Sequence, residues 1–166
     1  QHDARHPARQ HALSLAAVAL AAAGAAFSFS ASGRAGGPTT QIDWTGEART
    51  GIASFYADFF SGRKMADGTR MDPAKNNAAS LTLPLGTVAK VTNLETGRST
   101  IVTIRDRGPY VHGRIVDLSP SSARKIGLSR DDGLARVKVA PIALPLPDGR
   151  VKAGEGLVEA LNSEGR

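Results

Sequence analysis

One carboxylate of the chain lies where it could do acid chemistry. Asp106 ends an apolar stretch that begins near Ser99, and the turn Gly108-Pro109 follows at once. Reading back from Asp106 with a period of two places Ile104 and Val102 on its face. Since both are apolar, we expect Asp106 to leave the sheet from its drier side, beside a cleft, with a raised pKa. Such a carboxyl group can act as a general acid near neutral pH.

Other residues could complete a site, and each also has a simpler structural interpretation. Asp72 could act with Asp106, or could merely begin a turn at the following proline. Asp117 precedes a short predicted helix, and support of the helix start is the favoured interpretation. Sugar rings could be contacted by aromatic and cationic side chains, although core packing and solvated charge explain the same residues equally well. These candidate substrate contacts are Tyr56, Lys64, Arg107, Tyr110 and Arg114.

Short strands must position these residues. Alternating and β-branched runs predict strands at 52–56, 86–92, 99–105 and 135–140. A single short helix is predicted, with Ser119 as its N-cap, proline in its first turn and glycine at its end. Several short strands with one capped helix favour a small barrel over a layered sheet.

The chain divides into four segments by composition. Its 166 residues suffice for one domain with appendages. Residues 1–33 join a basic start to an uncharged, alanine-rich run, which predicts a signal peptide or an N-terminal anchor. Residues 34–49 predict a linker, residues 50–142 the folded domain, and residues 143–166 a C-terminal tail with at most a weak helix.

Composition indicates the cellular compartment of the protein and the classes of partner that it can bind. The chain has no cysteine, which excludes disulfides, a cysteine nucleophile and a cysteine-linked lipid anchor. Export without disulfides predicts the bacterial periplasm or cell envelope. The net charge of +6 suits an anionic cell wall, whereas no aromatic pattern interleaves the basic residues as nucleic acid binding would require. We therefore expect no nucleic acid partner, and membrane contact only through the N-terminal segment.

No metal or cofactor is predicted. His112 is the one histidine beyond the first eleven residues. No second histidine or carboxylate stands near it at a spacing typical of metal ligands.

A set of motifs resembles the RlpA-like (rare lipoprotein A) family over residues 50–142. The resemblance implies a mainly β fold, a six-stranded double-psi β-barrel with one or two short helices. It also implies an endolytic peptidoglycan lytic transglycosylase, with Asp106 matching the family aspartate as catalytic acid. The motifs are Gly51 to Tyr56, Gly62 to Gly68, Thr82 to Thr87, Val91 to Asn93, Asp106 to Pro109 and Gly113 to Ser119.

Two positions depart from the family pattern. The family glutamate is replaced by Thr69 and the family histidine by Ser80, and neither replacement exchanges protons near neutral pH. A noncatalytic barrel that binds or loosens the wall is therefore the alternative to an enzyme. A third possibility is an interaction domain for cell-envelope or division proteins.

Overall fold

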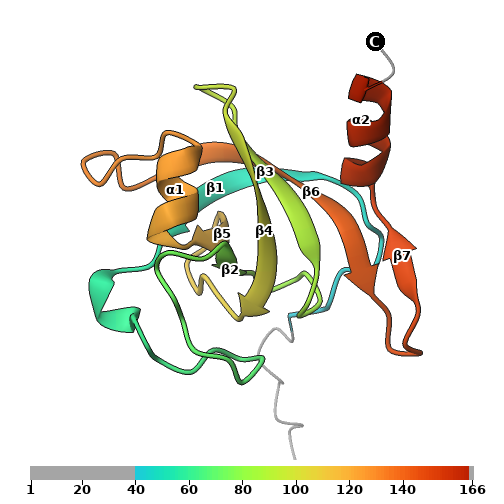
Figure 1. Cartoon of the computed structure of the whole chain (residues 1–166), viewed down its shortest axis with the longest axis horizontal. Coiled ribbons are helices and arrows are strands. Elements are labelled where there is room, and N and C mark those ends of the chain that lie inside the picture. Colours follow the sequence, from blue (N-terminus) through green and yellow to red (C-terminus); the bar gives the residue numbers. More distant parts are fainter. Residues whose placement is uncertain (1–39, 165–166) are drawn as a thin grey trace, which may run out of the picture. The chain divides into compact units, whose positions relative to one another are not determined.

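Seven strands and three helical segments lie within residues 40–164, the part of the chain that this computed structural model describes (Figure 1). The predicted export segment, residues 1–33, lies outside this part. The strands are β1 (Arg49–Phe55), β2 (Asn77–Ala79), β3 (Val88–Asn93), β4 (Ser99–Asp106), β5 (Arg114–Leu118), β6 (Ala135–Pro145) and β7 (Val151–Ala153). The helical segments are a 3₁₀ turn η1 (Asp58–Phe60), α1 (Pro120–Lys125) and α2 (Glu155–Glu164).

The first six strands close into a barrel. The order is β1-β5-β2-β4-β3-β6, and β6 pairs with β1 to complete the ring. The pairs β1–β5 and β2–β4 are parallel, and the other pairs are antiparallel. β7 lies outside the ring as a short hairpin partner of β6 (Figure 1). The predicted six-stranded, mainly β barrel with short helices is confirmed.

Alternation along each strand fills the barrel interior. Val102 and Ile104 of β4 are fully buried, whereas Ile101 is 42% exposed, as the period of two predicts. β6 buries Val137 and Val139 in the same way. The alternation is broken at the end of β4, where the register shifts: Ala78 pairs with Ile104, but Ala79 pairs with Asp106, so Arg105 is the extra residue of a bulge. The prediction that Asp106 shares the face of Val102 and Ile104 is therefore wrong, because the bulge turns Asp106 to the other face, which it shares with Ala79.

The predicted helix forms at its predicted cap. The Ser119 hydroxyl accepts a hydrogen bond from the backbone N–H of Ser122 at 3.2 Å, and Pro120 occupies the first turn. Ala123 and Ile126 join the barrel core, and Gly127, with φ of 76°, ends the helix.

The segments on either side of the predicted domain are folded onto the barrel. β6 runs through Pro145, and α2 packs against it. The helix approaches closely because Gly156 has no side chain, and a Cβ there would lie 2.5 Å from the Ala140 carbonyl oxygen. Before the barrel, the Asp43 N–H donates to the Thr82 carbonyl oxygen at 2.8 Å, so this end of the predicted linker is docked. None of the helices in the described residues is long and apolar enough to span a membrane.

Candidate active site

Asp106 and Asp117 lie in one row across the barrel wall. In the parallel pair β2–β4, Ala79 is in register with Asp106. In the antiparallel pair β2–β5, the same Ala79 is in register with Asp117, which in turn pairs with Ser54 of β1. Neighbouring strands lie about 4.8 Å apart, so β4 and β5, which carry Asp106 and Asp117, lie about 10 Å apart on either side of β2.

Three donors converge on the Asp106 carboxylate. The N–H groups of Ala66 and Arg107 each donate to Oδ1 at 2.9 Å, and the Tyr56 hydroxyl donates to Oδ2 at 3.1 Å. Burial raises the pKa of Tyr56 above its ordinary value, and the Asp106 charge adds to the effect. The phenol therefore stays protonated, and it holds Asp106 in place as a hydrogen-bond donor.

Asp117 has a different environment. Burial raises the pKa of Asp117, while the Ser54 hydrogen bond and the Arg114 charge oppose the rise and the Asp106 charge supports it. The Ser54 hydroxyl donates to Asp117 Oδ1. The favoured sequence interpretation placed Asp117 in support of the helix start, but its hydrogen-bond partner is in β1 and the helix cap is Ser119. The row thus joins a carboxylate that accepts three hydrogen bonds to a carboxyl group whose pKa is raised by burial.

Comparison with known proteins decides the family. The profile of the lytic transglycolase family matches residues 48–139, more than half of the chain. The chain belongs to this family. It is 49% identical over 105 residues to the endolytic peptidoglycan transglycosylase RlpA of Pasteurella multocida, covering 63% of this chain and 35% of that protein. The resemblance to the RlpA-like family, and with it the double-psi β-barrel, is confirmed.

Two other relatives have similar descriptions. The endolytic peptidoglycan transglycosylase RlpA of Vibrio cholerae is 36% identical over 124 residues, covering 72% of this chain and 47% of that protein. A probable endolytic peptidoglycan transglycosylase RlpA of Synechocystis is 51% identical over 78 residues, covering 47% of this chain and 24% of that protein. The chain spans less than half the length of each of these relatives.

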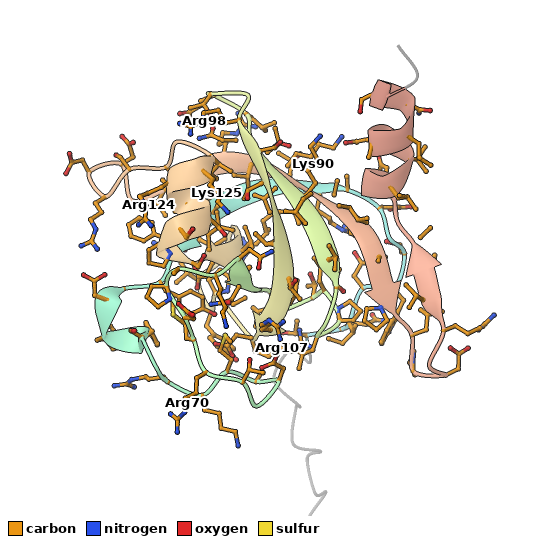
Figure 2. The ribbon with its side chains drawn as sticks, in the orientation of Figure 1. Arg70, Lys90, Arg98, Arg107, Arg124 and Lys125 are labelled. Atoms are coloured by element: carbon orange, nitrogen blue, oxygen red, sulfur yellow. The ribbon has the colours of Figure 1, made fainter. Side chains whose placement is uncertain are left out.

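The lytic transglycolase domain uses Arg107 as a clamp. The guanidinium donates from one nitrogen to the carbonyl oxygens of Ser80 at 2.9 Å and Leu83 at 2.6 Å. The Ser80 N–H in turn donates to the Asp106 carbonyl oxygen at 3.1 Å. Arg107 was predicted to contact substrate, and it directly follows Asp106, the last residue of β4 (Figure 2). Its two side-chain hydrogen bonds hold the loop after β2 in place.

Ser80 and Thr69 have local structural partners in this domain. Ser80 is buried, and its hydroxyl accepts from the Leu83 N–H at 3.2 Å. The Thr69 hydroxyl donates to Asp67 Oδ1 at 2.6 Å, and Asp67 forms an ion pair with Arg105 at 3.0 Å. Burial alone would raise the pKa of Asp67, but the hydrogen bonds from Thr69 and the Arg105 charge outweigh it and lower the pKa. Asp67 is thus held as an anion and is no substitute acid.

The remaining predicted residues divide into near and distant groups. The Arg114 charge acts on Asp117, and Tyr110 is 80% exposed beside Gly108 in the turn after β4. Asp72 accepts from the Ala74 N–H at 2.9 Å, as a turn-forming aspartate does. Lys64 is exposed in a loop, where its backbone bridges to that of Arg70. The structure therefore brings Tyr56, Arg107, Tyr110 and Arg114 to the row and places Asp72 and Lys64 in turns and loops.

Sequence reasoning missed Ser54 and the pairing of Asp117 with Asp106. The available signal was the alternation in β5, where the buried Val116 and Leu118 flank Asp117 and place it on the outer face. Among the described residues, no group of three metal-ligating side chains is assembled.

Proposed function

We propose that this domain cleaves the glycan strands of peptidoglycan without water, leaving 1,6-anhydro ends. The family membership and the names of the relatives support this activity. The observation that carries it is the row of Asp106 and Asp117 in two unlike environments across Ala79. Acid and base roles in one site are served by two carboxyl groups in different environments: burial raises the pKa of Asp117, and Asp106 accepts three hydrogen bonds.

The chemistry divides between the two groups. Asp117 gives its proton to the glycosidic oxygen as the bond from that oxygen to the anomeric carbon breaks. The C6 hydroxyl of the same sugar attacks the anomeric carbon and closes the anhydro ring. Its proton passes to Asp106, which Tyr56 and two backbone N–H groups hold in position. Exchange of one proton with solvent then restores the starting state, and no water needs activation.

A product assay tests the proposal. The purified protein is incubated with amidase-treated sacculi, and anhydro-ended fragments are measured by mass spectrometry. We expect such fragments from the wild type, and about a hundredfold or greater loss for Asp106→Asn and for Asp117→Asn. Asp131→Asn is the matched control, because Asp131 is an exposed loop carboxylate. Equal product from the wild type and both site variants would overturn the assignment.

A noncatalytic wall-binding barrel is the second candidate. The observation that favours it is the local hydrogen bonding of Thr69 and Ser80 at the positions of the family glutamate and histidine. It predicts that binding to sacculi survives Asp106→Asn while the wild type forms no anhydro product. The double variant Thr69→Glu with Ser80→His should then gain activity.

The proposed place of action is outside the cytoplasmic membrane, in the periplasm or cell envelope. The uncharged, alanine-rich run within residues 1–33 supports export. Fractionation of cells that produce the full chain tests this, and recovery in the cytoplasm would contradict it.

A further inference from the structure

A cavity lies near the carboxylate row, beside the residues that follow Ala79. It is a cavity of about 730 Å³ between the segment that precedes β1, the loop after β2, and strands β5, β6 and β7. Its lining residues are Gln41, Ile42, Asp43, Trp44, Thr45, Glu47, Arg49, Ser80, Thr82, Leu83, Ile115, Val139 and Lys152. Part of this wall, residues 41–47 and Lys152, lies outside the range 48–139 that the family profile matches.

The lining has the chemistry of a sugar site. Trp44, Leu83 and Ile115 supply aromatic and aliphatic surface, and Asp43 and Lys152 supply charged groups. The ring of a tryptophan offers a flat apolar face, while polar groups at a cavity edge fix orientation. Sugars present both an apolar ring face and a rim of hydroxyls. Trp44 is 37% exposed, so part of its surface is free for contact.

Hydrogen bonds to the backbone of residues 44–48 hold the wall in place before any ligand binds. The Lys152 ammonium donates to the Trp44 carbonyl oxygen at 3.1 Å, and the Glu155 N–H donates to the Gly46 carbonyl oxygen at 2.9 Å. The Ala48 N–H donates to a Glu155 carboxylate oxygen at 2.7 Å. A cavity whose wall is already ordered binds without the cost of ordering it.

The cavity adjoins the carboxylate row, because Arg107, the residue after Asp106, donates hydrogen bonds to the carbonyl oxygens of Ser80 and Leu83, which both line the cavity. Ser80 directly follows Ala79, the central residue of the row. On β5, Ile115 and Asp117 flank the buried Val116, so both leave the strand on its outer side. Two residues along a strand span about 7 Å, which is close to the length of one sugar ring in a polymer.

We propose that this cavity is a subsite for the glycan strand, in which Trp44 stacks on a sugar next to the one whose bond is cleaved. The inference rests on the proposed function for its choice of ligand. It adds a binding wall that lies beyond the family-matched range, built by the docked segment before β1 and by β7.

The chain offers a direct probe, because Trp44 is its single tryptophan. The ligand is a soluble, peptide-free tetrasaccharide of alternating N-acetylglucosamine and N-acetylmuramic acid. It is titrated into Asp117→Asn protein, which leaves the glycan uncleaved, while tryptophan emission and calorimetric heat are recorded. We expect a saturable emission change whose midpoint matches the calorimetric Kd.

Variants of Trp44 then distinguish a loss of stacking on the sugar from a loss of folding. Trp44→Ala should weaken calorimetric binding about tenfold, whereas Trp44→Phe, which keeps an aromatic ring, should bind within about threefold of the parent. Thermal melting of each variant confirms that the barrel is intact. Binding that leaves Trp44 emission unchanged would overturn the proposal, and so would unchanged affinity of folded Trp44→Ala or no binding at millimolar ligand.

The outcomes of the two proposals can be told apart. Anhydro product from the wild type together with Trp44-independent binding would leave the enzymatic proposal in place and remove the subsite. Trp44-dependent binding without any anhydro product would keep the subsite and assign it to a wall-binding barrel.

Discussion

Asp106 and Asp117 stand in register on either side of Ala79, one at the end of β4 and the other within β5. Asp106 accepts three hydrogen bonds, whereas Asp117 is half-buried beside Ser54. This inequality between neighbouring carboxyl groups is the physical basis of the acid and base roles assigned to them. The difference should affect the pKa of Asp117, the stability of the domain and its activity.

The pKa of Asp117 should move in opposite directions in two variants. Asp106→Asn removes a negative charge that raises it, so the pKa of Asp117 should fall. Ser54→Ala removes a hydrogen bond that lowers it, so the pKa should rise. Carbon-13 NMR titration of the aspartate carboxyl groups measures both shifts. Shifts in the same direction, or none, would contradict the coupling of the two sites.

Stability should also depend on the charge of Asp117. The pKa of Asp117 is raised in the folded state, so the protonated group favours the folded state over the unfolded one. This contribution to the free energy of unfolding is fully present below the unfolded pKa and is lost as pH rises through the folded pKa. Asp117→Asn should therefore be more stable than the wild type at pH 7, by less than about 1 kcal/mol given the partial exposure of the group. The difference should vanish near pH 3. Urea unfolding at the two pH values tests this, with Asp131→Asn as control.

Tyr56→Phe should reduce activity with little effect on folding. The change removes the hydroxyl that donates to Asp106 and keeps the ring, which packs edge-on against Phe60. Loss of one hydrogen bond to a charged group corresponds to about a tenfold fall in anhydro product formation. A fall in activity that only follows a fall in Tm would indicate a structural role.

Arg107→Lys should lower stability more than glycan affinity. One guanidinium nitrogen donates to the carbonyl oxygens of both Ser80 and Leu83, and the lysine side chain is one atom shorter, so its ammonium group ends short of that nitrogen's position. We expect a loss of about 1–2 kcal/mol in urea unfolding. Arg124→Lys, a change at an exposed arginine of α1, is the control. A large loss of glycan affinity with unchanged stability would instead support the prediction that Arg107 contacts the substrate.

Gly156→Ala should loosen α2 from the barrel. The new Cβ would lie 2.5 Å from the Ala140 carbonyl oxygen, so the helix must shift, at a cost of about 1–3 kcal/mol. Hydrogen exchange should then rise in α2 and in the hairpin of β7. Val158→Ala on the exposed face of α2 is the control and should change little. Unaltered exchange in Gly156→Ala would show that the helix docks by other contacts.

The sequence by itself determined what depends on neighbours along the chain. The period of two in β4 identified Val102 and Ile104 as core residues, and the structure buries both. The bulge at Arg105, which no local pattern announced, turns Asp106 to the opposite face. The cap at Ser119 and the stop at Gly127 bounded α1. The family motifs added the barrel class. Each of these signals is local, because strand alternation and helix capping act within a few residues.

Only the tertiary structure decided which residues meet. β2 is three residues long, too short for a periodic signal, yet Ala79 in it sets the register between Asp106 and Asp117. The docking of residues near Trp44 likewise depends on contacts with β7 and the start of α2, more than a hundred residues away. Strand registers and long-range contacts of this kind are fixed when the barrel closes and its core packs. The residues that take part carry no local sequence pattern that predicts their partners.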